Sequence, residues 1–281
     1  MKGPMNEHLL VKKIIEWLEE DMPYGDITSQ NIDFQENHAQ ATFIAKEVGV
    51  ICGMDVMKLV FQTLDKTILF EPSVKDGDSV KSGLILGRLT GPLDKILMGE
   101  RLALNLCQRL SGIATMSHLY AKAVSDYPVR IVDTRKTTPG LRQLEKYAVR
   151  VGGCYNHRSS LSDAVMVKDN HIAAAGSMEK AVTQIRASIP HTTKIEVEVE
   201  SLKGLEEALN LGVDIIMLDN MTNELLSAAV AINQGRALLE ASGNMTLDRI
   251  VDVAKTGVNI ISVGGLTHSV KALDISLKFL S

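Results

Sequence analysis

The chain has 281 residues, 45% of them hydrophobic and 23% charged, which is typical of a soluble globular protein with one large or two average domains. Its formal net charge of −4 argues against general nucleic-acid binding, because such proteins usually present a basic surface. The three cysteines are an odd number without a CxxC spacing, which favours free thiols in a reducing compartment over a disulfide framework or a zinc site. We therefore expect a cytoplasmic protein.

The first predicted element is an amphipathic helix near the N-terminus, where Leu10, Ile14 and Leu18 recur every four residues. The same segment lacks a long apolar region and carries several acidic residues, so neither a signal peptide nor a transit peptide is expected. No later segment is long and apolar enough to span a bilayer, and no membrane contact is expected.

The next segments predict a mixed α and β domain. Residues 39–53 favour a strand, residues 54–64 a helix, and residues 68–91 strands joined by the turn KDGDS. That turn resembles those of lipoyl and biotinyl carrier domains, but no modifiable lysine lies at a hairpin tip. Pro92 then begins a helical pattern, and Ser111 and Gly112 are expected to break it before a second helix that ends near Ser125.

Six short β-rich runs follow: VRIVD, DAVMV, KIEVEV, VDIIML, RALLEA and VNIISV. The later runs alternate with helical stretches that end at Gly212, Gly235 and Gly257, where C-terminal glycines are expected. This alternation predicts a parallel sheet covered by helices. A dinucleotide-binding sheet and an α/β barrel both fit, but no GxGxxG follows the first run. We favour a barrel, and since six strands are too few to complete one of eight, we expect it to be open or incomplete.

Basic residues gather around the first of these strand ends. Residues 130–171 contain eight Lys or Arg, four Asp or Glu, and two His. A solvated helical face is the ordinary explanation of such a charge run. The alternative is a site for a ligand with several negative charges, because arginine matches carboxylates in two-point geometry.

The later strand ends carry glycines and carboxylates. Gly243 and the pair Gly264–Gly265 end the last two runs, where barrel enzymes frequently bind phosphate, although tight turns are the simpler explanation. Glu198 and Asp219 end neighbouring runs. They suit Mg²⁺ or a developing cation, and the ordinary alternative is a salt bridge to a nearby lysine, Lys168 or Lys136. Strand alternation does not choose among Glu198 and the carboxylates two residues before and after it.

Several long motifs together closely resemble the quinolinate phosphoribosyltransferase family of de novo NAD synthesis. They are DTRKTTPGLRQLEKYAV, GGCYNHRSSLSDAVMVKDNHI, IEVEVES, IIMLDN, LEASGN and ISVGGLTHSVKALDISL. The similarity runs from YGDITS, near Asp26, to the C-terminus. It implies transfer of the phosphoribosyl group of phosphoribosyl pyrophosphate to quinolinate with decarboxylation, giving nicotinate mononucleotide, CO₂ and pyrophosphate.

The resemblance also implies an architecture. An N-terminal α/β sandwich domain is expected over residues 1–112, joined by the C-terminal tail 270–281. An open α/β barrel with the active site is expected over residues 113–269, and seven strands are implied where the pattern shows six. A homodimer or a larger assembly of dimers is implied, in which Arg101 of one subunit completes the neighbour's quinolinate site. From the sequence alone, an ion pair of Arg101 with Asp94 or Glu100 is the simpler interpretation.

Matched motif by motif, the family's site residues fall into two groups. The quinolinate group is Arg101, Thr134, Arg135, His157, Arg158 and Lys168. The phosphoribosyl pyrophosphate group is Lys136, Glu198, Asp219, Ser242, Gly243, Asn244, Gly264, Gly265, Leu266 and His268. The resemblance makes Lys136, Lys168, Glu198 and Asp219 the catalytic set, with Mg²⁺ as cofactor near Glu198 and Asp219, held directly or indirectly.

Three other functions fit parts of the pattern. A molybdenum-associated phosphoribosyltransferase paralogue would share the fold, but the intact VKDNH and NHR motifs favour the quinolinate enzyme. A Schiff-base aldolase would use Lys168 or Lys136. A phosphate-binding barrel without enzymatic activity would have no use for the carboxylates.

Overall fold

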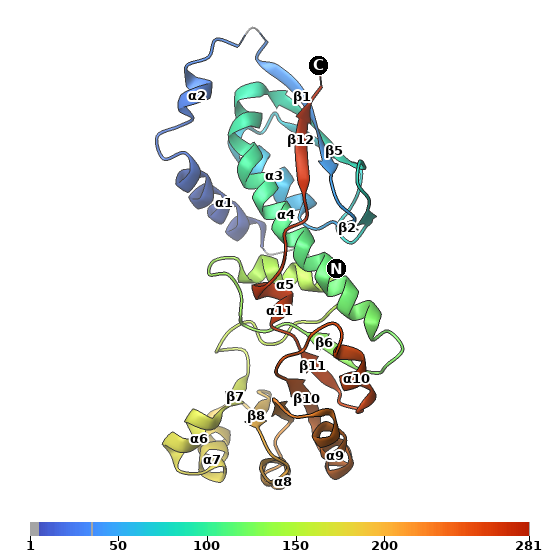
Figure 1. Cartoon of the computed structure of the whole chain (residues 1–281). Helices are drawn as coiled ribbons and strands as arrows, with labels where there is room; N and C mark the ends of the chain where they lie inside the picture. The colour runs from blue at the N-terminus through green and yellow to red at the C-terminus, as the bar shows by residue number, and fades with distance from the viewer. Residues whose placement is uncertain (1–5, 35, 281) are drawn as a thin grey trace. The chain divides into compact units, whose positions relative to one another are not determined.

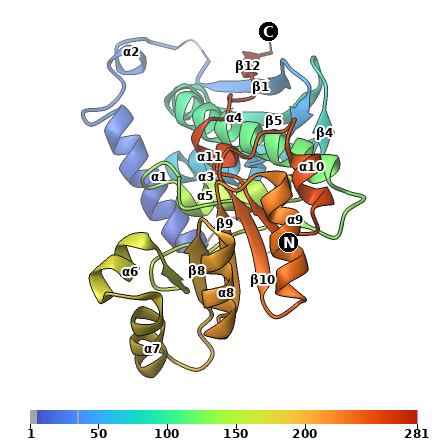
Figure 2. The same ribbon diagram turned by 60° about the horizontal axis from the view of Figure 1, so that its bottom comes forward.

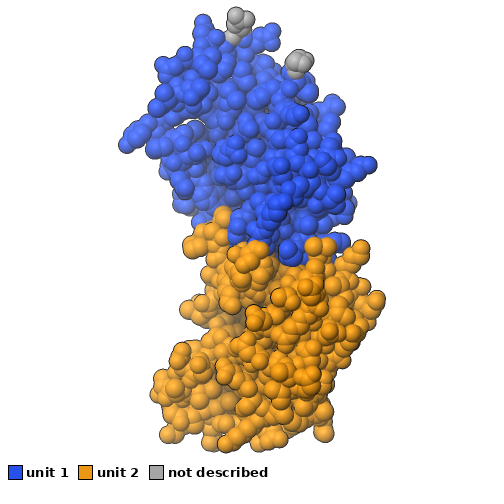
Figure 3. Space-filling model, viewed as in Figure 1, with its two compact units in different colours: residues 1–118, 143–153, 270–281 blue, residues 119–142, 154–269 orange. Residues whose placement is uncertain are grey.

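The computed structural model describes residues 6–34 and 36–280, which Figure 1 and Figure 2 show from two directions. The chain divides into two compact units, coloured in Figure 3. Unit 1 contains residues 1–118, 143–153 and 270–281, and unit 2 contains residues 119–142 and 154–269. The expected boundary at residue 112 lies inside one continuous helix, α4 (Leu93–Ala123), and residues 143–153, expected in the barrel domain, belong to unit 1.

Unit 1 is built on a four-stranded antiparallel sheet in the order β12-β1-β5-β3. These strands are β1 (His38–Ala45), β3 (Leu69–Pro72), β5 (Ile85–Pro92) and β12 (Ile275–Phe279), and a separate pair joins β2 (Gly49–Val50) to β4 (Ser79–Val80). The helices besides α4 are α1 (Glu7–Asp21), α2 (Ile27–Gln30), α3 (Met54–Leu64) and α5 (Arg142–Val151). The return of the C-terminal tail to this part of the chain is confirmed, because β12 pairs with β1.

Two predicted helices of unit 1 are confirmed. Leu10, Ile14 and Leu18 are the buried residues of α1. The helix α3 begins at Met54 after Gly53, which has no side chain to cap the helix. The Asp76 carboxylate supplies it from the KDGDS turn, since its Oδ1 accepts the backbone N–H of Gly53 at 2.9 Å and of Met54 at 3.0 Å. A distant residue thus satisfies donors that the local sequence leaves open.

The predicted break at Ser111 and Gly112 is wrong, because α4 continues through both residues. Ser111 is fully buried, and its hydroxyl accepts the Cys52 N–H at 2.9 Å and donates to the Cys52 carbonyl at 3.2 Å. Gly112 lets the C-terminal tail approach, since a Cβ here would lie 2.2 Å from the Lys271 carbonyl oxygen. The two small residues therefore serve packing against other segments and do not end the helix.

Unit 2 contains a six-stranded parallel sheet in the order β6-β11-β10-β9-β8-β7. The strands are β6 (Arg130–Val132), β7 (Val165–Val167), β8 (Ile195–Val199), β9 (Ile215–Asp219), β10 (Leu238–Ser242) and β11 (Ile260–Ser262), one for each predicted run. The helices are α6 (Asp169–Ala175), α7 (Met178–Ser188), α8 (Leu202–Asn210), α9 (Asn223–Asn233), α10 (Ile250–Lys255) and α11 (Gly265–His268). Figure 2 shows α8 and α9 side by side along β8, β9 and β10. The predicted glycines after α8, α9 and α10 all have positive φ.

The sheet has six strands and not the seven that the resemblance implied. The segment at Tyr155 forms a single parallel bridge to Val132, with its N–H donating to the Ile131 carbonyl at 2.8 Å. Its carbonyl accepts the Asp133 N–H at 3.1 Å. One bridging residue is too short to give a strand pattern in the sequence. Within the described residues β7 pairs only with β8, so the sheet is open, as expected.

Two further expectations concern the chain as a whole. The three cysteines, Cys52, Cys107 and Cys154, are free and buried, and burial raises the pKa of all three thiols. Among the described helices, none combines the length and the apolar character needed to cross a membrane.

The packing at Gly112 gives a test of the fold. Alanine is normally better than glycine in a helix by about 1 kcal/mol, but the clash of its Cβ with the Lys271 carbonyl adds overpacking strain of about 1–3 kcal/mol. We expect Gly112→Ala to lower the free energy of unfolding in urea. Thr183→Ala, on the exposed side of α7, is the control and should be neutral or slightly stabilising. A Gly112→Ala protein more stable than the parent would contradict the packing argument.

Candidate active site

The strand register collects the predicted carboxylates on one face of the parallel sheet. Glu198 pairs with Met217 of β9, and Met217 pairs with Glu240 of β10. Asp219 pairs with Ser242 at the carboxyl ends of the same two strands. Registered neighbours, and residues two apart on one strand, have side chains on the same side of a sheet. All five side chains therefore lie on one face, and Glu198, Asp219 and Ser242 lie toward its carboxyl edge.

Lys168 joins the basic and acidic sides of this edge. It directly follows β7, and its ammonium group donates to the Glu198 carboxylate. Both side chains are only partly buried, at 42% and 15% exposed. The salt bridge weighed from the sequence is thus present for Glu198. Asp219 differs, since its carboxylate accepts the side-chain amide of Asn220 at 2.7 Å.

The loop with His157 and Arg158 is held by Asp133, a residue that the sequence analysis left without a role. Asp133 is fully buried at the end of β6. Its carboxylate accepts the His157 N–H at 2.8 Å and the Asn156 amide at 2.6 Å. These bonds place the His157–Arg158 loop beside the residues that follow β6, namely Thr134, Arg135 and Lys136. The only sequence signal was an acid at the end of an apolar run.

Arg135 and Arg158 lie close enough to repel each other. Partial burial, then the charge of Arg135, lowers the pKa of the Arg158 guanidinium, while Glu196 and Asp163 oppose the shift. Arg158 Nη1 donates to the Ala164 carbonyl at 2.8 Å. Two guanidinium groups held together in this way favour a bound anion, because an anion relieves their repulsion.

The end of β11 meets the loop after β6. The Thr267 hydroxyl donates to the Lys136 carbonyl at 2.7 Å. A Cβ at Gly264 would lie 3.1 Å from His268 Nε2 and 3.2 Å from Lys136 Cδ, so these two side chains lie directly over the glycine. Gly265 has open space above it, and Leu266 is fully buried, so that Leu266 can face a ligand only through its backbone.

The loops after β9 and β10 have an unusual backbone. Asn220, Gly243 and Asn244 have positive φ angles of 54°, 96° and 49°. A Cβ at Gly243 would lie 2.2 Å from Asn220 Oδ1, so glycine is required there on both counts. Arg249, which the sequence analysis missed, donates to the Gly243 carbonyl at 3.0 Å and to the Met221 carbonyl at 2.8 Å. It ties the two loops together.

A buried cluster of His157, Glu196 and Glu240 lies on the same face. His157 Nε2 is 3.2 Å from Glu196 Oε2 and 3.5 Å from Glu240 Oε1. The two carboxylates are 3% and 2% exposed. Burial, then the charge of Glu196, raises the pKa of Glu240, and His157 opposes the shift. The sequence left Glu196 undecided and overlooked Glu240, although each is an acid inside an apolar strand.

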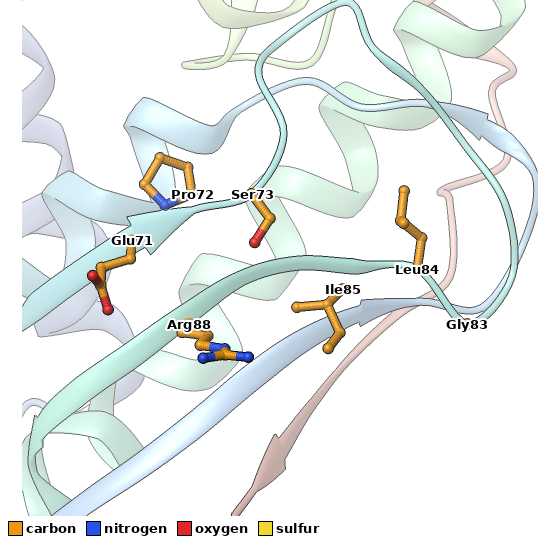
Figure 4. A pocket seen from close by; sticks show the side chains of 7 residues that line it. All are labelled: Glu71, Pro72, Ser73, Gly83, Leu84, Ile85 and Arg88. Carbon is orange, nitrogen blue, oxygen red and sulfur yellow. The ribbon is translucent and has the colours of Figure 1, made fainter.

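Two surface hollows are lined by none of these residues. One, of about 570 Å³, lies between β3 and β5 and is lined by residues that include Glu71, Gly83, Ile85 and Arg88 (Figure 4). The other, of about 590 Å³, lies at the amino ends of the parallel strands, around Lys194, Asp214 and Arg236. The first hollow belongs to the antiparallel sheet of unit 1 and contains none of the candidate site residues. The second is at the wrong end of the parallel strands, because active sites of parallel barrels form at the carboxyl ends. We therefore assign neither hollow to catalysis.

Both halves of the chain match family models. Residues 26–111 match the model of the N-terminal domain of quinolinate phosphoribosyl transferase, and residues 113–278 match that of its C-terminal domain.

Curated relatives and solved structures agree. A probable nicotinate-nucleotide pyrophosphorylase (carboxylating) of Synechocystis is 47% identical over 94% of this chain and 90% of its own, and one of Bacillus subtilis is 46% identical over 96% and 93%. The crystal structure of NadC from Streptococcus pyogenes is 44% identical and superposes with a TM-score of 0.93 over 99% of both chains. The nicotinate-nucleotide pyrophosphorylase of Francisella tularensis is 40% identical, with a TM-score of 0.93 over 98% of each chain. The chain therefore belongs to the quinolinate phosphoribosyltransferase family.

Proposed function

We propose that this chain transfers the phosphoribosyl group of phosphoribosyl pyrophosphate to quinolinate with decarboxylation, giving nicotinate mononucleotide, CO₂ and pyrophosphate in NAD biosynthesis. The observation that carries the proposal is the charge arrangement at one edge of the parallel sheet. Arg135, Arg158 and Lys168 gather there beside the carboxylates of Glu198 and Asp219. A dicarboxylate and the cation that develops on a sugar have opposite charges, and this edge offers partners for both.

Quinolinate belongs on the basic side. Its two carboxylates suit the guanidinium groups of Arg135 and Arg158, which relieve their mutual repulsion by binding an anion. Lys168 adds a third cation, and Thr134 and His157 belong to the same two loops. A substrate carboxylate competes with Glu198 for Lys168, so quinolinate binding releases the Glu198 carboxylate toward the sugar.

Phosphoribosyl pyrophosphate belongs on the other side. The Gly243 loop and the end of β11 are the proposed source of backbone N–H groups for its phosphate, and Gly265 has open space where a side chain would lie. The residues assigned to this substrate are Lys136, Glu198, Asp219, Ser242, Gly243, Asn244, Gly264, Gly265, Leu266 and His268. Lys136 lies over Gly264 beside His268, which supports a common role at the leaving pyrophosphate.

Glu198 and Asp219 suit Mg²⁺, the cofactor that we assign to this site. Both are partly exposed carboxylates on one sheet face, at the ends of neighbouring strands, and Mg²⁺ prefers such oxygen ligands together with substrate phosphates and water. When bound, the metal would take up negative charge of the leaving pyrophosphate.

The protein's own groups account for the remaining steps. Pyrophosphate leaves with the bonding electrons, and Glu198 and Asp219 stabilise the resulting sugar cation. The pyridine nitrogen lone pair then forms the new bond to the sugar, which makes the ring cationic. CO₂ leaves from the adjacent carbon, whose electron pair is stabilised by the neighbouring positive nitrogen and finally takes a proton from water. Catalysis is therefore positioning and electrostatics without a covalent enzyme intermediate.

The basic side predicts substrate preference and the effect of Arg158. Quinolinate should have a far higher kcat/KM than nicotinate, which lacks the second carboxylate. Arg158→Ala should weaken quinolinate binding by about 2–5 kcal/mol, roughly 30-fold to several thousand-fold, because a buried substrate carboxylate loses its partner. The control Arg186→Ala removes an arginine that binds the carbonyls of Leu211 and Gly212. It should change neither the kcat/KM for quinolinate nor the affinity for quinolinate. Equal use of quinolinate and nicotinate would contradict the assignment.

The acidic side predicts that Asp219→Asn weakens Mg²⁺-dependent turnover more than quinolinate binding. Titration of activity with Mg²⁺ and equilibrium binding of quinolinate separate the two effects. The control is Asp214→Asn, at the opposite end of the same strand, where the carboxylate pairs with Lys194 at 2.6 Å. If Asp219→Asn abolished quinolinate binding and left turnover at saturation normal, the placement of phosphoribosyl pyrophosphate here would be wrong.

A shared active site in a homodimer, or in a larger assembly of dimers, forms part of the proposal. Arg101 is exposed on α4 and makes no ion pair among the residues that the structure describes, whereas Asp94 pairs with Lys95 at 3.1 Å. The intrachain pair that the sequence alone favoured is thus not formed. An exposed arginine without an internal partner is available to a neighbouring subunit.

Subunit mixing tests this arrangement. Arg101→Ala and Lys168→Ala are each expected to be inactive. If Arg101 serves the neighbouring site, a mixed dimer carries both lesions in one site and neither in the other, so activity should return after subunit exchange. If Arg101 acts in its own chain, every site keeps one lesion and no activity returns. Exchange itself is verified by native mass spectrometry of differently labelled subunits.

A further inference from the structure

The imidazole of His157 has both ring nitrogens engaged within unit 2. Its Nδ1 accepts the backbone N–H of Arg158 at 2.7 Å. Its Nε2 faces the buried carboxylates, 3.2 Å from Glu196 Oε2 and 3.5 Å from Glu240 Oε1. The backbone N–H of His157 is itself bound by Asp133. The residue is thus fixed from three directions.

These contacts determine the tautomer. A nitrogen that accepts an N–H carries no hydrogen, so the hydrogen of the neutral ring is on Nε2, directed at the carboxylates. The three residues have the side chains of a divalent-metal site, with their ligand atoms within 4.8 Å of one another. A metal ion, however, would have to bind Nε2. Because Nδ1 accepts the N–H of Arg158, Nε2 carries the hydrogen and has no free lone pair for a metal. The geometry therefore favours a hydrogen-bonded cluster over a metal centre.

We infer that Glu196 and Glu240 are positioning residues for the quinolinate site: Glu196 accepts the Nε2–H of His157 and Glu240 places a second carboxylate beside it, so that Nδ1 fixes the backbone of Arg158. His157 then acts through Arg158 and not by donating a hydrogen bond to substrate. The inference rests on the proposed placement of quinolinate at Arg135 and Arg158.

The charges around the cluster fit this role. Glu196 attracts the Arg158 guanidinium electrostatically, against the repulsion from Arg135. Burial and the charge of Glu196 raise the pKa of Glu240, and His157 and Ser262 of β11 oppose that shift only in part. Glu196 Oε1 and Glu240 Oε1 have no hydrogen-bond partner among the described residues, so two acids stand opposite one imidazole N–H. The excess of acceptors keeps the Nε2–H turned inward and the cationic loop above it supported.

The decisive variant is Glu196→Leu, which removes the nearer acceptor and leaves the Nε2–H of His157 buried without it. Loss of a hydrogen bond to a charged acceptor corresponds to roughly 10- to 100-fold in an equilibrium constant, and Glu240 Oε1, 3.5 Å away, replaces it only in part. We expect the KM for quinolinate to rise by that factor, with a smaller change in kcat and none in the KM for phosphoribosyl pyrophosphate. Glu196→Gln, whose amide oxygen still accepts the N–H, should restore most of the affinity. Glu200→Leu, at an exposed position just beyond β8, is the matched control and should behave as the parent.

Nitrogen NMR of the histidine rings in the parent protein provides a readout that does not depend on how the glutamate variants fold. In the parent protein at pH 7.5, the His157 signals, identified by their loss in His157→Asn, should show hydrogen on Nε2 only. Hydrogen on Nδ1, or displacement of the Nε2 hydrogen by added Mg²⁺, Mn²⁺ or Zn²⁺, would overturn the inference. So would an unchanged quinolinate KM in a folded Glu196→Leu protein. Arg158→Ala keeps the two proposals distinguishable: if it leaves quinolinate binding intact, the placement of quinolinate fails, whatever the tautomer.

Discussion

The structure of unit 2 depends on the register of its parallel strands, which puts charged side chains of both signs on one face of a sheet that is otherwise apolar. A charge in such a place is costly unless it is paired or hydrogen-bonded. The chain meets this constraint in different ways at different depths. At the carboxyl ends of the strands, Lys168 and Glu198 pair with each other. Deeper in the sheet, Glu196 and Glu240 face the imidazole of His157. The polar face is therefore an ordered set of contacts before any substrate is considered.

The same constraint explains why the loops are held so firmly. The backbone of the His157–Arg158 loop is fixed by the buried Asp133, and the loops after β9 and β10 by Arg249. Asp133 accepts the His157 N–H and the Asn156 side-chain amide, and Arg249 donates to two backbone carbonyls. Preorganisation of this kind matters for a reaction whose catalysis consists of placing two anionic substrates, because binding sites that must reorganise lose affinity.

Much of the fold could be predicted from the sequence, and the features that could not be predicted share one physical cause. The six strands, α3 and the terminal glycines follow from local periodicity and turn chemistry. The candidate site residues other than Arg101 come from loops that follow strands of the parallel sheet or from the carboxyl ends of those strands. The continuous α4 could not be predicted, because Ser111 and Gly112 have their roles in contacts with Cys52 and Lys271, far away in the chain. Asp133, Glu240 and Arg249 were missed for the same reason. A buried acid inside an apolar strand is a detectable signal, but its partner is set by tertiary structure.

Lys168 and Glu198 pair with each other, but the pair is weak enough for each charge to remain available to a ligand. A partly exposed ion pair has little net stability, because water and salt screen it. An incoming carboxylate can therefore replace Glu198 as the partner of Lys168 at small cost. In the proposed mechanism, the freed Glu198 then faces the developing sugar cation together with Asp219 on the next strand. The proposed mechanism thus couples binding of the dicarboxylate to preparation of the sugar side through one weak salt bridge, and a stronger, fully buried pair in its place would oppose both.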